Sequence, residues 1–113
     1  MGVQDCDRPR PIYSSLHDDP ACAEIIDEFV VGVSARVDHL QDADSRGNLR
    51  ELEGLAAQLA LDAQKMGFGP LAEVAAAVER ACADGYAKPA HDGVVALTEV
   101  ALRIRLSHRG AMS

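Results

Sequence analysis

Aromatic side chains are scarce in this chain, which has no Trp, two Phe and two Tyr among its 113 residues. Long apolar runs are missing too, because charged residues interrupt every hydrophobic stretch, so no segment is predicted to span a membrane. The first fifteen residues, MGVQDCDRPRPIYSS, contain no apolar core of a signal peptide. We therefore expect a cytoplasmic protein without membrane partners.

The chain has little positive charge and none of the usual cofactor motifs. Its net charge of −7 repels phosphate backbones, so nucleic acid is an unfavourable partner. The three cysteines, at positions 6, 22 and 82, are not spaced as metal ligands; Cys22 and Cys82 are expected as buried apolar residues and Cys6 as a free thiol. The Gly67-Phe68-Gly69 segment is expected to be a turn rather than a phosphate-binding loop. We predict no metal, no cofactor and no enzymatic activity.

What the sequence does contain is a repeated helical pattern. Alanine is abundant, and apolar residues recur every three or four positions in four stretches, at about residues 20–42, 48–66, 70–85 and 91–107. Asp19 and Pro20 suit the N-cap and first position of the first helix. Short polar or glycine-containing segments separate the stretches, including an expected loop over residues 86–90. This pattern predicts an all-α, antiparallel up-and-down four-helix bundle.

The bundle is expected to occupy residues 12–107 as a single domain. A short helical turn over residues 12–16 would open it, with Ile12, Tyr13 and Leu16 packed on the helices. Residues 1–11, with their two prolines, are predicted to form a flexible arm. Residues 108–113 are predicted to form a frayed tail.

The organising stretch is the second helix with the turn that follows it. One apolar stripe is formed by Leu49, Leu52, Ala56, Leu59, Ala63 and Met66. Gly67-Phe68 ends the helix before Pro70 begins the next one. This stretch, together with IYSSLHDDPACAEIIDEFV before it and MGFGPLAEVAAAVERA overlapping its end, resembles the histidine-containing phosphotransfer (HPt) domain family over roughly residues 12–106. Members of that family are four-helix bundles that relay a phosphoryl group between receiver domains.

The resemblance also shows which family residues are missing. In the register set by Leu55-Ala56 and Gly67-Phe68, the phosphoacceptor His position is Ala57, while Leu59 matches the motif Leu. Lys, Gly and a small residue of the motif are replaced by Ala60, Leu61 and Gln64. A methyl group cannot act as a nucleophile, so the resemblance implies an HPt-like module without its usual catalytic residue.

The resemblance implies a receiver domain of a response regulator or hybrid kinase as partner. The apolar character of this helix face favours docking, although neutral drift to alanine, a good helix former, would also produce it. The predicted partner-binding residues are Gly54, Ala57, Gln58, Ala60, Leu61, Gln64 and Lys65.

Two other hypotheses remain open at the level of sequence. The strip of Ala57, Ala60 and Leu61 would also suit a helical oligomerisation module that pairs with its own copy across a two-fold axis. Alternatively, phosphotransfer would use a non-standard histidine. The candidates are His17, His39, His91 and His108, none of which has the flanking pattern of a phosphoacceptor.

Overall fold

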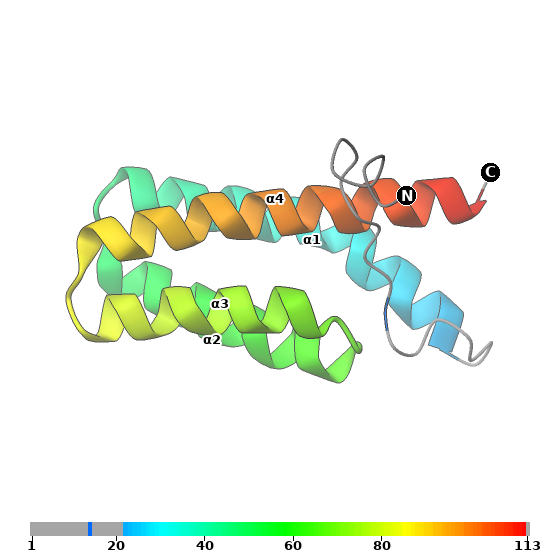
Figure 1. The fold of residues 1–113 in the computed structure, drawn as a ribbon, viewed down its shortest axis with the longest axis horizontal. Helices are drawn as coiled ribbons and strands as arrows, with labels where there is room; N and C mark the ends of the chain where they lie inside the picture. Colours follow the sequence, from blue (N-terminus) through cyan, green and yellow to red (C-terminus); the bar gives the residue numbers. More distant parts are fainter. Residues whose placement is uncertain (1–13, 15–21, 113) are drawn as a thin grey trace, which may run out of the picture.

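The computed structural model describes residue 14 and residues 22–112, and these form an antiparallel four-helix bundle (Figure 1). No strand is present among them, so the predicted all-α bundle is confirmed. The helices are α1 (Ala23–Ser45), α2 (Leu49–Lys65), α3 (Gly69–Ala83) and α4 (Ala87–Met112).

The helices are arranged in a ring that follows their order in the chain. α1 packs against α2 and α4, and α3 packs against the same two helices. In Figure 1, α3 and α4 lie in front of α2 and α1. Each helix turns one apolar stripe inward, as the spacing of three and four predicts. The largest fully buried side chains include Leu40, Leu52, Leu59, Phe68, Leu71, Leu97 and Ile104.

The three turns between helices have the same backbone motif. Gly47, Gly67 and Gly85 have φ values of 68°, 80° and 78°, in the left-handed region that glycine adopts without steric cost. In each turn the glycine N–H and the next N–H donate to carbonyls of the last helical turn; Phe68 N, for example, donates to Ala63 O at 2.8 Å. This is the Schellman motif, and it reverses the chain within three residues.

The ends of the helices differ from prediction mainly in α4. The sequence places a loop over residues 86–90, but α4 begins at Ala87 and Pro89 lies in its first turn. Proline is tolerated there because first-turn N–H groups need no intrahelical acceptor. At the other end, the backbone stays helical to Met112, whereas the predicted helix ends at 107. The predicted arm, the Asp19 cap with Pro20, and the turn at 12–16 apart from Ser14 lie outside the described residues.

Two contacts fix how the helices approach one another. The rings of Phe29 in α1 and Phe68 in the α2–α3 turn stack with centroids 5.6 Å apart. On the opposite side of the core, Gly93 of α4 lies so close to α3 that an added Cβ would meet Val78 Cγ2 at 2.7 Å. The first contact joins α1 to the α2–α3 turn, and the second sets the spacing of α3 and α4.

Candidate docking face on α2

Five of the seven predicted partner-binding residues are exposed on the side of α2 that turns away from the core. Leu52, Ala56, Leu59 and Ala63 are buried, and the opposite side of the helix is exposed at Gly54, Leu61 and Lys65, which are separated by seven and four positions. Gln58 and Gln64 are exposed beside them. We call the seven predicted residues together the α2 face.

The two alanines are less accessible than the rest of the α2 face. Ala57 and Ala60 are half-buried, and Ala60 packs against the core cluster. The position where the resemblance places a phosphoacceptor therefore carries a methyl group at the margin of the surface. Lys65, the nearest reactive side chain noted in the sequence, follows eight positions later, roughly 12 Å along the helix axis.

An ion pair fixes one edge of the α2 face to α1. Arg36 of α1 lies 2.9 Å from Asp62 of α2, and both side chains are about one-third exposed. The Gln58 side-chain amide donates to the same carboxylate at 3.2 and 3.3 Å. Sequence reasoning did not identify Asp62 or its partner, because only the (i, i+4) spacing of Gln58 and Asp62 is visible locally. The ion pair joins α1 to α2 beside the face.

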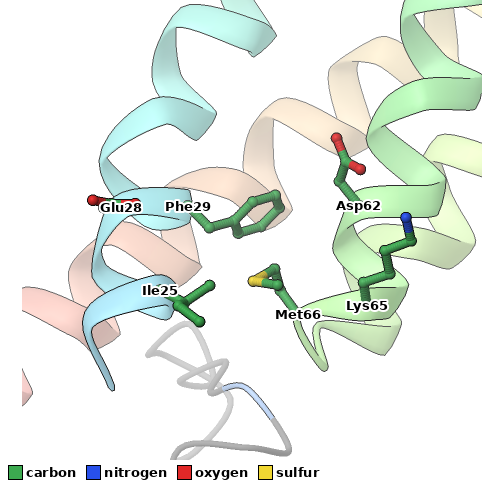
Figure 2. Close-up of a pocket in the computed structure, with 6 residues that line it drawn as sticks. All are labelled: Ile25, Glu28, Phe29, Asp62, Lys65 and Met66. Carbon is green, nitrogen blue, oxygen red and sulfur yellow. The ribbon is translucent and has the colours of Figure 1, made fainter. Parts of the chain in front are cut away.

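A groove of about 300 Å³ adjoins Lys65, between the first turns of α1 and the last turn of α2. Figure 2 shows Ile25 and Phe29 of α1 pointing toward Met66, the C-cap residue of α2, while Glu28 points away. Ser14 borders the same end of the bundle, because its hydroxyl donates to the Met66 carbonyl oxygen. Sequence reasoning assigned no role to this groove, which exists only where the two helix ends meet.

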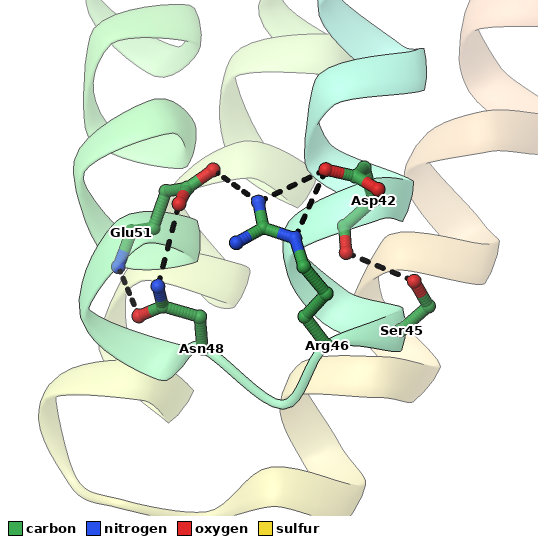
Figure 3. Close-up of polar contacts among 5 residues, drawn as sticks. All are labelled: Asp42, Ser45, Arg46, Asn48 and Glu51. Carbon is green, nitrogen blue, oxygen red and sulfur yellow. Dashed lines mark hydrogen bonds and ion pairs between the residues drawn. The ribbon is translucent and has the colours of Figure 1, made fainter.

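The turn between α1 and α2 is held by a polar network at the far end of α2 (Figure 3). Arg46 contacts Asp42 at 2.9 Å and Glu51 at 2.7 Å, and these two carboxylates raise the pKa of the guanidinium. The Asn48 side chain caps α2 by accepting from the Glu51 N–H at 3.1 Å. The charged groups are therefore paired within the turn, and we assign them a structural role.

The histidines whose side chains are described belong to α1 and α4, and none of them lies on α2. His39 is exposed on α1. His91, also exposed, lies with its Nδ1 2.6 Å from Asp44 Oδ2 and so joins the start of α4 to the end of α1. His17 and the side chain of His108 lie outside the described residues. Phosphotransfer through a non-standard histidine stays a prediction.

Within the described part of the chain, the structure contains no group of three His, Cys, Asp or Glu side chains that would hold a metal ion. Cys22 is half-buried, and Cys82 is buried with a free thiol; burial raises the pKa of the Cys82 thiol. Over the same residues, no helix combines the length and hydropathy that crossing a bilayer requires.

Comparison with known proteins adds no family assignment. A scan against protein-family models, a search of curated proteins and a search of solved structures each return no significant match for this chain. The functional argument therefore depends on the bundle, the α2 face and the residues that the face carries.

Proposed function

We propose that this chain is an HPt-like signalling module that binds a receiver domain without transferring a phosphoryl group. It would hold or sequester the receiver of a response regulator or hybrid kinase in the cytoplasm. The observation that carries the proposal is the position of Ala57, at the edge of an exposed α2 face in a four-helix bundle whose second helix ends at Gly67-Phe68.

The residues of the α2 face argue against phosphotransfer there. Transfer to an HPt domain needs an imidazole nucleophile, and a nearby cation stabilises the phosphoryl charge. Alanine stands at both corresponding positions, 57 and 60. Lys65 is a poor replacement, because it lies eight positions after Ala57, roughly 12 Å along the helix axis.

The same residues suit a protein-protein contact. Leu61 is 54% exposed and sits between polar side chains such as Gln58 and Lys65, as an apolar anchor with a polar rim would. The face lies on a helix packed in the bundle, so little backbone ordering would oppose binding there. A homodimer through Ala57, Ala60 and Leu61 is the competing hypothesis for this face.

The test is a binding titration with purified receiver domains from the source cell, using wild type and Leu61→Glu. We expect the substitution to weaken binding by roughly tenfold or more, because it places a charge at the centre of a desolvated contact. Leu102→Glu in α4 is a matched control, since Leu102 is 52% exposed and lies on another helix. Unchanged affinity of the Leu61→Glu variant would exclude the α2 face as the binding site.

Sedimentation analysis of the same variants addresses the competing hypothesis. If the α2 face mediates self-association, Leu61→Glu should dissociate the oligomer and Leu102→Glu should leave it intact. A wild-type protein that stays monomeric at all concentrations would exclude the homodimer on this face.

A further inference from the structure

The groove between the first turns of α1 and the end of α2 presents mainly apolar side chains. Ile25 is 52% exposed, and Phe29 and Met66 are half-buried. Figure 2 shows these three side chains around one hollow, with Lys65 of the α2 face beside it. Its volume of about 300 Å³ matches the smallest ligand pockets, of roughly 300 Å³, and leaves room for a bulky apolar side chain.

Ser14 places the N-terminal part of the chain at this groove. The Ser14 side chain is buried, and its hydroxyl donates to the carbonyl oxygen of Met66, a residue 52 positions later that lines the groove. Ile12 and Tyr13 directly precede Ser14 in the sequence. Because a chain spans at most about 3.6 Å per residue, both backbones lie within about 7 Å of that of Ser14. The two apolar side chains can therefore reach the groove.

A segment of the same chain also has an advantage over a separate partner. Its attachment at Ser14 gives it an effective concentration on the order of millimolar at the groove. The segment before Ser14 contains two prolines, at positions 9 and 11, whose fixed φ lowers the entropy lost on docking. Little ordering therefore opposes its binding.

The charges of the segment and of the groove rim are complementary. Arg8 and Arg10 are the only lysine or arginine residues before Arg36 in the sequence. Glu24 and Glu28 are exposed on the first turns of α1, and Glu28 lines the groove. The basic residues thus lie a few positions before Ser14, and the acidic ones lie beside the groove that Ser14 borders.

We propose that residues 8–13 dock in this groove as an intramolecular strap. Ile12 and Tyr13 cover the exposed side of Ile25, and the two arginines of the strap lie toward the acidic rim of α1. The strap borders Lys65 and so bounds the α2 face at that end. The proposal does not depend on receiver binding.

The experiment is limited chymotrypsin digestion of the full chain, with cleavage after Tyr13 followed by mass spectrometry. We expect Ile25→Glu to raise this rate by at least roughly tenfold, because a charge in the groove releases the strap and cleavage follows the released population. Val31→Glu is the matched control: Val31 is 77% exposed on the same helix and is not a groove residue, so its rate should equal that of wild type. Cleavage after the exposed Tyr86 is the internal reference.

Equal rates for wild type and Ile25→Glu would overturn the proposal, as would an equal rise for Val31→Glu. The same variants identify any other occupant. If Ile25→Glu dissociates a dimer in sedimentation, or weakens binding of a receiver domain, while cleavage after Tyr13 is unchanged, the groove binds a second copy or the receiver and the strap is wrong.

A second measurement keeps the groove free of added charge. In a chain whose three native cysteines are replaced by alanine, Tyr13→Cys with Ile25→Cys should form a disulfide on mild oxidation. The pair Tyr13→Cys with Val31→Cys should give at most roughly a tenth of that yield, because the strap does not reach Val31. Circular dichroism verifies that both variants are folded. Equal yields from the two folded variants would contradict docking of the strap at Ile25.

Discussion

At the scale of single residues, the helical glycines differ in whether a side chain would fit. At one of them a neighbouring helix fills the space, and at two others the space is open. Gly93 lies where α4 approaches α3, and a Cβ there would meet Val78 Cγ2 at 2.7 Å. Gly32 in α1 and Gly54 in α2 have no atom within 4 Å of the corresponding Cβ position. Helix propensity favours alanine at all three positions, so any difference between them reports packing.

Gly93→Ala should therefore destabilise the protein, while Gly32→Ala should stabilise it. We expect a loss of about 1–3 kcal/mol in the free energy of unfolding for the first variant, because Val78 is β-branched and must shift. For the second we expect a gain of about 0.5–1 kcal/mol. Urea denaturation monitored by circular dichroism measures both. Equal stabilisation by the two alanines would show that α3 and α4 do not approach closely at Gly93.

At the scale of helices and turns, the three connections set the direction of every helix. In each connection a glycine of positive φ is followed by the residue directly before the next helix, which is Asn48, Phe68 or Tyr86. The α2–α3 turn also contributes Phe68, which is buried and stacks on Phe29 of α1. Its geometry therefore affects the end of α2 and the groove beside Lys65 together.

Gly67→Ala should destabilise the protein by about 1–2 kcal/mol, because an L-residue with a Cβ is strained in the left-handed conformation. Gly54 lies within α2, the helix before this turn, and has an ordinary helical φ. Gly54→Ala should therefore be neutral or stabilising. Denaturant midpoints of the two variants give the comparison. A Gly67→Ala variant as stable as wild type would mean that the turn does not require a positive φ.

At the scale of the whole molecule, the ring of helices keeps the α2 face apart from the exposed surface of α4. The α2 face carries the positions where the HPt resemblance places phosphotransfer chemistry. α2 and α4 are not neighbours in the ring, because each packs against α1 and α3. A variant on α4, such as Leu102→Glu, should accordingly leave binding at the α2 face unchanged.

Introducing the residues of the HPt motif tests whether the bundle has the geometry of an HPt domain. The triple variant Ala57→His, Ala60→Lys, Leu61→Gly should acquire some acid-labile, base-stable phosphate from a phosphorylated receiver, provided that docking survives the loss of Leu61. Wild type should acquire none. Label on wild type would contradict the proposal and favour a non-standard histidine, with His91 beside Asp44 the first to replace by alanine.

The sequence determined by itself the features that depend on neighbouring residues. The apolar spacing within each helix indicated the four helices and their buried sides, and Gly67 and Gly85 marked helix ends that the structure confirms. The seven predicted residues of the α2 face do lie together on one helix. Local conformational preference and periodicity are sufficient for these features, because they act over a few residues.

Only the tertiary structure decided how far each residue is covered and which distant residues meet. Ala57 is half-buried rather than fully outward, Arg36 reaches Asp62, and His91 contacts a residue 47 positions earlier in the chain. These contacts depend on how the helices rotate and cross, and that is set by packing of the whole core. Periodicity identifies the buried side of a helix, but the neighbouring helices determine where that side ends.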